Sequence, residues 1–471
     1  MQIIVNFFTV KIYNSSYTSP EMSLSVKLKK GLDIRMIGKA ERILAGEVGS
    51  ECYGVKPVDF PGLIPKLNVR PGDMVSAGSP LFHDKIRPEI IFSSPVSGKV
   101  ASVIRGARRK LLEVVVEKAG NEFIDFGVSD PSGLSRERIK ELLLISGLWP
   151  VVRQRPYHIV ANPRDVPKAI FISGFDTAPL APDYNFIMDN SSASLFRSGI
   201  TALKKLTDGK INLVLNARDD SSEVLKRASD VEISHFSGPH PAGNIGIHIH
   251  HLDPLNKGEV VWFINLQDVL AIGRLFEEGR YNHERIIALT GSEILNPQYY
   301  KIKSGLSVSS LVNDNVKPGN LRYISGNVLT GTAIQPEGFV GFYDSQVTVI
   351  PEGDYFEFFG WMKPGLNKFS FSRTFASALI PSKSFSPDTN LHGGERAFVM
   401  TGQYEKVVPM DIFPMQLLKA ILSEDIDLME NLGIYEIAEE DFALCEYICP
   451  SKIEIQSIVR KGLELMIKEM N

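Results

Sequence analysis

Short apolar stretches separated by turn residues fill the first quarter of the chain, from Val26 to about Lys118. The pattern is clearest between Val69 and Val100, where Gly, Pro, Asp and Ser interrupt runs of two or three apolar residues. A longer β-type run over residues 111–116 ends the stretch. Spacing of this kind is typical of short paired strands. The pattern therefore predicts an N-terminal β domain.

The period of the pattern changes after Ser135. Residues 136–145 have helical spacing and lead to Gly147. Strand-type and helical segments then alternate at 169–172, 193–206, 211–215 and 267–278. Such alternation favours βα units around a parallel sheet. Residues 285 to about 370 return to short strands with Gly turns, and the chain becomes helical after Pro409.

Composition narrows the class of protein. The 471 residues are 44% hydrophobic and 23% charged, as in an ordinary globular protein, and a net charge of −4 gives no case for nucleic acid or an anionic membrane surface. Three cysteines cannot build a disulfide framework, which favours a reducing cytoplasm. The most apolar stretch, 260–276, is interrupted by polar residues, so no membrane span is expected. The opening ten residues make a poor signal peptide, and we expect residues 1–21 to be a disordered or non-native extension.

Two cysteines near the C-terminus have part of an iron–sulfur spacing. Cys445 and Cys449, followed by Pro450, fit the last two positions of C-x2-C-x2-C-x3-C-P. Phe442 and Glu439 occupy the positions of the other two thiolates. Two thiolates do not complete a four-ligand site, so we interpret the pair as ordinary buried cysteines in the remnant of a cluster-binding helix.

Five of the nine histidines fall between residues 235 and 251. On a strand, His248 and His250 would project from the same face, a spacing that suits metal ligands. No nearby Cys or close Asp/Glu pattern completes a site. We therefore expect no metal and favour a turn between domains whose histidines make local hydrogen bonds.

The hairpin pattern of residues 69–100 resembles a biotinyl/lipoyl-type domain. Asp84 and Lys85 lie where such domains carry a modified lysine, which raises the alternative of a carrier protein. Arg87 and Pro88 follow, unlike the flank that a carrier requires. Structural reuse of the fold is the favoured interpretation.

Several long strings identify a family. From about Met22 to Asn471 the chain is similar to the A subunit of the bacterial Na⁺-translocating NADH:quinone oxidoreductase. The matching strings are KKGLDI from Lys29, GARRKL from Gly106, SGLWPVVRQRP from Ser146, GPHPAGNIGIHIH from Gly238, QDVLAIGRLF from Gln267, SGNVLTGT from Ser325, FFGWMKPGLNKFS from Phe358 and LCEYICPSK from Leu444. This family is related to the NADH- and flavin-binding subunits of complex I and the Rnf complex.

The related flavoproteins hold their flavin phosphate in a glycine-rich loop, GxGGAGFPT, whose backbone amides face the phosphate. The equivalent residues here are 146–151. Trp149 and Val151 fill space that glycines would leave, and Pro150 removes an N–H donor. The resemblance therefore implies a subunit with no cofactor of its own, with flavins, iron–sulfur centres and the NADH site on partner subunits.

The resemblance and the patterns together predict an α/β multidomain fold. We expect a lipoyl-like barrel-sandwich domain over 22–125 and a Rossmann-like α/β domain related to flavin-binding subunits over 126–261. A β-grasp-type domain with a leading helix (262–380) and a C-terminal helical domain with the degenerate cluster motif (381–471) follow.

The resemblance implies a peripheral subunit on the cytoplasmic face of the bacterial inner membrane, held there by partner subunits, some of them embedded in the membrane. The complex passes electrons from NADH to ubiquinone and exports Na⁺. The subunit then has a scaffold or quinone-interacting role, and a quinone would contact Trp149, Arg153, Arg155 and His158 in the vacated flavin region. The alternatives are a flavin- and NADH-binding electron-input subunit and the lipoyl-like carrier.

Overall fold

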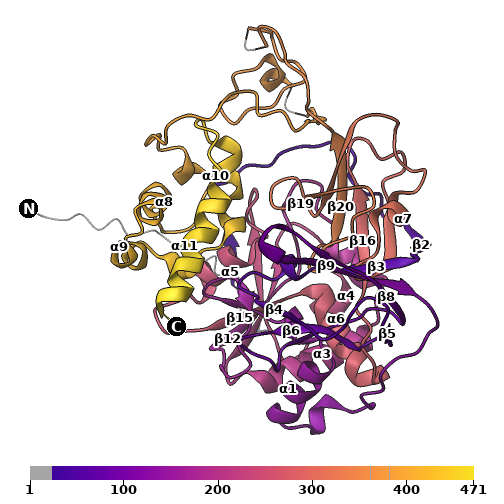
Figure 1. Ribbon diagram of the computed structural model, residues 1–471. Coiled ribbons are helices and arrows are strands. Elements are labelled where there is room, and N and C mark those ends of the chain that lie inside the picture. Colours follow the sequence, from indigo (N-terminus) through magenta and orange to yellow (C-terminus); the bar gives the residue numbers. More distant parts are fainter. Residues whose placement is uncertain (1–23, 361, 381, 471) are drawn as a thin grey trace, which may run out of the picture.

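The computed structural model describes residues 24–360, 362–380 and 382–470. The extension expected over 1–21 lies outside them. In Figure 1 the N-terminal strands are indigo, the C-terminal helices are yellow, and an orange loop segment projects at the top. Among the described residues, no helix is long and apolar enough to cross a membrane.

Two sheets form the N-terminal β domain, one in the order β3-β9-β8-β5 and the other in the order β4-β6-β7. Leu81, Val100 and Val114 are completely buried between them. The short strands that the alternating pattern predicts are present. Their bounds are Cys52–Val55 (β3), Pro65–Leu67 (β4), Met74–Val75 (β5), Pro80–Asp84 (β6), Ile91–Ser93 (β7), Gly98–Arg105 (β8) and Leu111–Lys118 (β9).

A seven-stranded sheet forms the centre of the molecule, in the order β1-β14-β13-β12-β15-β10-β11. The first five of these strands are parallel, and β10 runs antiparallel to both of its neighbours, β15 and β11. The predicted parallel βα arrangement is therefore present. The bounds are Ser25–Lys27 (β1), Arg153–Arg155 (β10), Ile159–Val160 (β11), Ala169–Ser173 (β12), Lys210–Asn216 (β13), Glu232–Ser237 (β14) and Val261–Asn265 (β15).

Alternate residues of this sheet enter two separate cores, because side chains on a strand alternate between its faces. Ile170 and Ile172 pack in one core with helices α1 (Arg136–Ile145), α3 (Ala193–Leu206) and α6 (Leu266–Glu278). Phe171 enters the other core, with α5 (Ile245–Leu252) and the C-terminal helices. A Cβ on Gly199 of α3 would lie 2.2 Å from the Val269 carbonyl oxygen, so glycine permits the close approach of α3 and α6.

A six-stranded sheet in the order β19-β18-β20-β16-β17-β2 follows in the chain. A short helix, α7 (Val308–Val312), lies between its third and fourth strands in sequence. The bounds are Leu44–Glu47 (β2), Glu284–Thr290 (β16), Tyr299–Lys303 (β17), Leu321–Ser325 (β18), Thr332–Ile334 (β19) and Gln346–Pro351 (β20).

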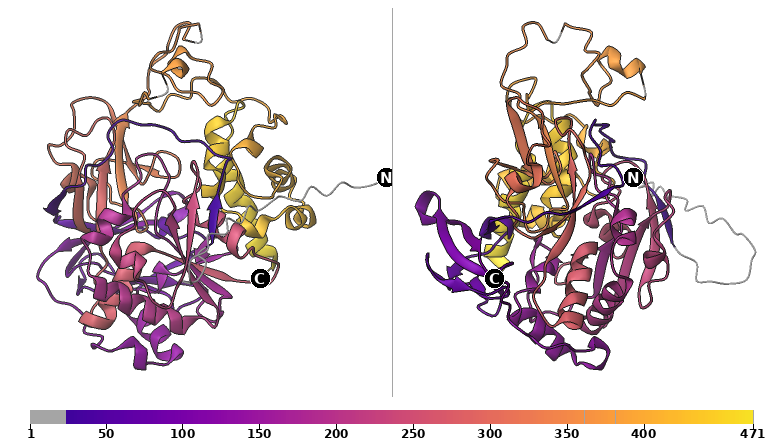
Figure 2. Two further views of the ribbon diagram at one scale, coloured as in Figure 1. Left: turned by 180° about the vertical axis from the view of Figure 1, so that it is seen from behind. Right: turned by 90° about the vertical axis from the view of Figure 1, so that its right-hand side faces the viewer.

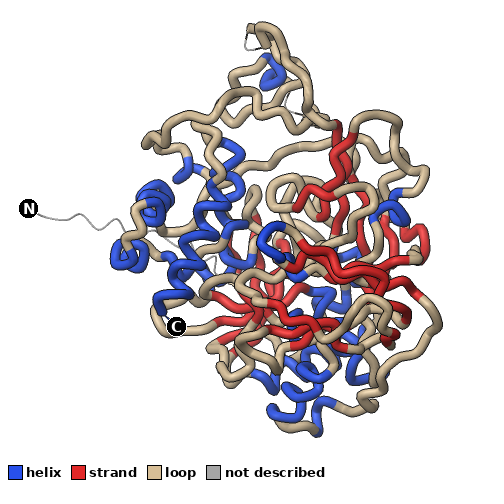
Figure 3. Tube along the Cα trace, in the orientation of Figure 1, coloured by secondary structure: helices blue, strands red, loops and turns tan. Residues whose placement is uncertain are grey.

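The C-terminal helices pack against the second face of the central sheet, as two views in Figure 2 show. Between β20 and α8 the chain is almost entirely loop (Figure 3). The C-terminal helices are α8 (Pro414–Leu422), α9 (Ile426–Asn431), α10 (Ala443–Ile448) and α11 (Ile455–Met470); two short helices, α2 (Tyr184–Asp189) and α4 (Glu223–Lys226), complete the fold.

Several segments join a different unit from the one that the sequence predicts. β1 pairs with β14 of the central sheet and β2 with β17 of the six-stranded sheet, although both fall within the predicted N-terminal domain. β15 and α6 belong to the central α/β unit rather than leading the next domain. His248 and His250 lie on helix α5, so the strand geometry considered for a metal pair is wrong.

Candidate functional site

A crevice opens at the carboxyl ends of β12 and β15. The chain crosses from β12 to β13 on one side and returns to β15 on the other, so these two strands mark the point where the strand order reverses. Open parallel sheets bind ligands at this point, because the loops leaving the two strands diverge there. Ser173 and Asn265, the last residues of the two strands, both line a cavity of about 130 Å³.

The walls of the crevice combine aromatic rings with hydrogen-bonding groups. Phe175 and Phe263 supply the rings, and Asn244 and Asn265 supply amides. The antiparallel strand β10 contributes Arg153, and Glu440 reaches the crevice from the C-terminal region. A polar planar ligand would meet both an apolar wall and directional donors, the usual composition of a small-molecule pocket.

Arg153 is the cation of the crevice. Its guanidinium lies between two rings, 4.5 Å from the centroid of Phe263 and 4.2 Å from that of Tyr343. It donates to Asn265 Oδ1 at 2.7 Å and to His158 Nε2 at 3.1 Å, while its Nε has no partner. The ring contacts and two neutral acceptors hold the group in place and leave its charge available to a ligand.

His240 also lines the crevice. It is 3% exposed, and burial lowers its pKa to about 4, so the ring is neutral near pH 7. Thr177 Oγ1 accepts from the Gly243 N–H at 2.9 Å and lies 3.1 Å from His240 Nδ1. Nε2, on the other side of the ring, is buried and has no hydrogen-bond partner, whichever nitrogen carries the ring proton. Such an unsatisfied buried polar atom is uncommon, because it costs about 1–3 kcal/mol.

Three consecutive carboxylates of the C-terminal region lie beside the crevice. Arg155, which is completely buried, donates to Asp441 at 3.2 Å and to Glu440 at 2.9 Å. Burial raises the pKa of Asp441 to about 6, against the opposing effect of Arg155. Glu439 pairs with His158 and Arg460. Although burial alone would raise the pKa of Glu439, these two groups lower it well below its usual value.

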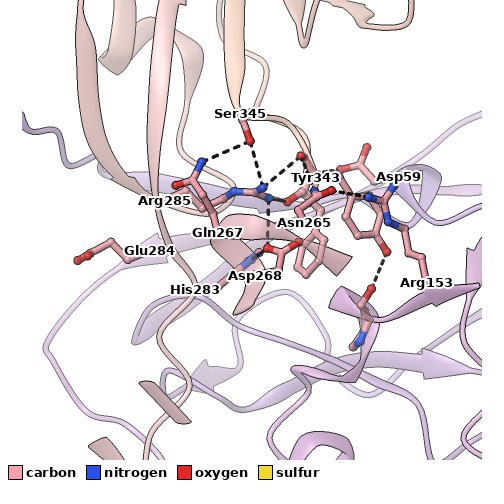
Figure 4. A network of polar contacts seen from close by, with 12 residues as sticks. Asp59, Arg153, Asn265, Gln267, Asp268, His283, Glu284, Arg285, Tyr343 and Ser345 are labelled. Carbon is pink, nitrogen blue, oxygen red and sulfur yellow. Dashed lines mark hydrogen bonds and ion pairs between the residues drawn. The ribbon is translucent and has the colours of Figure 1, made fainter. Parts of the chain in front are cut away.

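Figure 4 shows a buried polar network beside Arg153 and Tyr343. Asp268 of α6 accepts from His283 Nε2 at 2.9 Å and lies 3.8 Å from Arg285 of β16. Arg285 also donates to the carbonyl oxygens of Phe342 and Tyr343.

Each of the three ionisable side chains of this network has one buried polar atom without a partner: Asp268 Oδ2, His283 Nδ1 and Arg285 Nε. Although burial alone would raise the pKa of Asp268, Arg285 and then His283 lower it. The network fixes the 342–343 turn, and with it the Tyr343 ring against Arg153.

The four residues predicted to contact a quinone do not all come together. Arg153 lines the crevice, and Arg155 and His158 lie behind it in ion pairs and hydrogen bonds. Trp149 lies apart in the core with 0% exposure: its Nε1 donates to the Ala161 carbonyl at 2.8 Å, and its ring meets Trp262 edge-on at 5.4 Å. Phe175 and Phe263 form the expected apolar wall instead. Phe175 follows β12 and Phe263 lies within β15, so the sequence could have indicated their role only if the order of strands in the sheet had been known.

The vacated flavin loop has no room for a phosphate. Trp149–Val151 form a buried 3-10 turn. Gly147 has a φ of +74°, and a Cβ there would lie 2.1 Å from the Ser93 hydroxyl of the N-terminal domain. The loop therefore packs against β7, and its residues do not fit a flavin phosphate.

The cysteines and Lys85 also have defined surroundings. Cys445 and Cys449 are buried, and the Tyr404 hydroxyl donates to the Cys449 sulfur at 3.0 Å. Within the described ranges, no group of three or more His, Cys, Asp or Glu side chains is arranged to hold a metal ion. Lys85 is exposed after β6, and its backbone N–H donates to the Ile64 carbonyl at 2.8 Å.

Comparison with known families gives three matches along the chain. Residues 26–119 match a model described as the NqrA N-terminal barrel-sandwich hybrid domain. Residues 134–281 match the NqrA second alpha/beta domain, and residues 286–335 match the NQRA C-terminal domain. The expected barrel-sandwich domain and the α/β domain after it are thereby confirmed at this level.

Curated relatives match almost the whole chain. A protein of Yersinia pestis, named as the A subunit of Na(+)-translocating NADH-quinone reductase, is 40% identical over 450 residues, covering 94% of this chain and 100% of its own length. Proteins of the same name from Rhodopirellula baltica and Neisseria meningitidis are each 39% identical, over 94% of this chain and 98% and 100% of their own lengths. Among solved structures, an NAD⁺-reducing [NiFe]-hydrogenase in the air-oxidized state aligns over 71% of this chain and 61% of its own with a TM-score of 0.37 and 9% identity.

Proposed function

The chain belongs to the NqrA family, the A subunits of Na(+)-translocating NADH-quinone reductase, and on that basis we propose that it serves as the A subunit of such a complex. The complex passes electrons from NADH to a quinone and couples the transfer to Na⁺ transport. The identity of 40% over 94% of the chain carries this conclusion. The proposal places the protein at the cytoplasmic face of the membrane, held by the other subunits of the complex.

Within that complex, the crevice is proposed to hold a quinone headgroup. A quinone is a flat ring with carbonyl oxygens that accept hydrogen bonds and no phosphate. Phe175 and Phe263 suit the ring. Arg153 suits one oxygen, and His240 with its proton on Nε2 suits the other. The buried Nε2 without a partner is the observation that supports the site best.

Electron transfer in this subunit is proposed to involve no resident cofactor. The 149–151 turn leaves no phosphate cradle, and the side chains of Glu439 and Phe442 stand where two cluster thiolates would be needed. Flavins, iron–sulfur centres and the NADH site then lie on partner subunits. This argument disfavours the alternative of a flavin- and NADH-binding electron-input subunit. Lys85 is exposed, so the carrier alternative remains, and the intact mass of the purified protein tests it. We expect that mass to equal the one encoded by the sequence, with no modification on Lys85.

A quinone titration of the purified subunit tests the crevice. His240→Phe keeps a ring but removes the N–H donor, and we expect it to weaken binding by about five- to tenfold, the worth of one hydrogen bond of about 1–1.4 kcal/mol. His251→Phe is the matched control, because His251 bonds the Ile247 carbonyl of its own helix and lies outside the crevice. Affinity should be constant from pH 7 to 8, because the pKa of His240 is about 4 and that of the neighbouring Asp441 is about 6.

Two results would refute the crevice as the quinone site. One is the absence of saturable binding to the wild-type subunit. The other is equal binding by His240→Phe and wild type, with thermal unfolding showing that both are folded. Membership of the complex would stand in either case, and the role of this subunit would reduce to scaffolding.

A further inference from the structure

A lobe of the molecule, formed by residues 354–360, 362–380 and 382–384, projects away from the sheets. It follows β20 and appears in orange at the top of Figure 1, and it stands clear of the body again in both views of Figure 2. It contains no strand, and only a 3-10 turn at Ala376–Leu379 among its described residues.

Large apolar side chains of the lobe face solvent. Phe356 is 104% exposed, Phe358 82% and Leu379 84%, and Tyr355, Met362 and Leu366 are each more than half exposed. Elsewhere the exposed large apolar side chains are spaced apart along the chain, as is normal for a globular protein, except for the neighbours Val399 and Met400. An exposed apolar cluster of this kind marks a surface that binds a membrane or another protein.

The backbone of the lobe makes several hydrogen bonds within itself. Gly360 donates to the Glu357 carbonyl, Lys368 to that of Gly365, and Ala376 to that of Pro364. Because these groups already have partners, moving the lobe out of bulk water does not strip them of hydrogen bonds.

The lobe is also basic, in a chain whose net charge is −4. Its sequence contains Lys363, Lys368, Arg373 and Lys383 against only Asp354 and Glu357. Lys363 and Lys368 both pair with Glu357, while Arg373 is exposed. Aromatic rings beside basic side chains are typical of segments that lie in a membrane interface, where the rings enter the headgroup region and the cations meet anionic lipid.

We propose that this lobe docks directly into the headgroup region of a bilayer containing anionic lipid. Two features favour lipid over an apolar protein partner: the excess of positive charge, which is complementary to an anionic surface, and a convex projection that requires no matching groove. The proposal does not depend on the quinone site.

Flotation of the purified chain with protein-free vesicles tests it. We expect binding to vesicles of phosphatidylcholine with about 30% phosphatidylglycerol, and much weaker binding to phosphatidylcholine alone. The double variant Phe356→Ser, Phe358→Ser should lower the partition coefficient at least about tenfold. Met74→Ser with Val128→Ser is the matched control, since these side chains are 68% and 70% exposed on other parts of the chain.

A second variant separates charge from apolar contact. Lys363→Gln with Arg373→Gln should lower binding to the anionic vesicles about fivefold per charge at low salt and leave binding to neutral vesicles unchanged. Trp361 falls within the sequence of the lobe, and the other two tryptophans are completely buried. Anionic vesicles should therefore shift the tryptophan emission to the blue, and Trp361→Phe should abolish the shift.

Three outcomes would overturn the proposal: no flotation with anionic vesicles, equal flotation of the Phe356/Phe358 variant and wild type, or binding that occurs only when partner subunits are present in the membrane. The last outcome would show that a partner protein, and not lipid, binds the lobe.

Discussion

Removal of Arg155 should release the C-terminal helices from the central sheet. Arg155 is completely buried on β10 and bonds Asp441 at 3.2 Å and Glu440 at 2.9 Å, across 286 and 285 residues of chain. In the Arg155→Met variant the Asp441 carboxylate stays at 0% exposure without its cation. Breaking a buried pair in this way costs about 3–5 kcal/mol, because one charge is left without compensation. At about 1 °C per kcal/mol for a chain of 471 residues, the unfolding midpoint should fall by about 3–5 °C at pH 8.

The loss should shrink as the pH falls. Burial raises the folded-state pKa of Asp441 to about 6, and Arg155 is the largest group opposing that rise, so its removal raises the pKa further. A carboxyl whose pKa is higher in the folded than in the unfolded state stabilises the fold at low pH and loses that contribution as the pH rises through the folded value. The variant should therefore recover most of its stability by pH 5, where a neutral Asp441 no longer needs a cation.

Differential scanning fluorimetry from pH 5 to 8 measures both effects. Arg164→Met is the control, because that arginine is 78% exposed in its pair with Glu89 and should contribute less than about 1 kcal/mol. Adding Asp441→Asn to Arg155→Met should restore part of the midpoint at pH 8. An unchanged midpoint at pH 8, or a deficit that is the same at pH 5 and pH 8, would refute this account of the pair.

Two further predictions concern the vacated flavin region. Gly147→Ala should destabilise the chain by about 1–3 kcal/mol, since the backbone has a φ of +74° and the new Cβ would meet a serine of β7. Gly133→Ala is the control, because its Cβ would meet nothing within 4 Å. Equal denaturation midpoints for the two variants would contradict this prediction. The purified subunit should be colourless in visible light and free of iron, and about one equivalent of flavin or four of iron would favour the electron-input alternative.

Local pattern was a sound guide to the elements and to the family. Strand-length apolar runs with turn residues predicted the N-terminal strands, and the change to helical period after Ser135 predicted α1, α3 and the parallel sheet. These features depend on neighbours within a few residues, so the sequence contains them directly. The strings that identify the family are likewise continuous stretches of chain.

The lobe shows a limit of that approach. The sequence has no continuous basic run, and its net charge gave no reason to expect an anionic surface as a partner. Only the structure sets the described residues of the lobe apart from the body, where spaced cations and exposed rings occupy one projection.

The site depended on contacts between distant parts of the chain. By itself the sequence determined the strands, the helices, the family and the loss of the glycine loop and two thiolates. The tertiary structure decided that β1 pairs with β14, that Trp149 enters the core while Arg153 faces the crevice, and that Arg155 meets carboxylates far along the chain. The physical reason is that a side chain's environment is set by the elements packed against it, and local periodicity does not contain the order in which strands join a sheet.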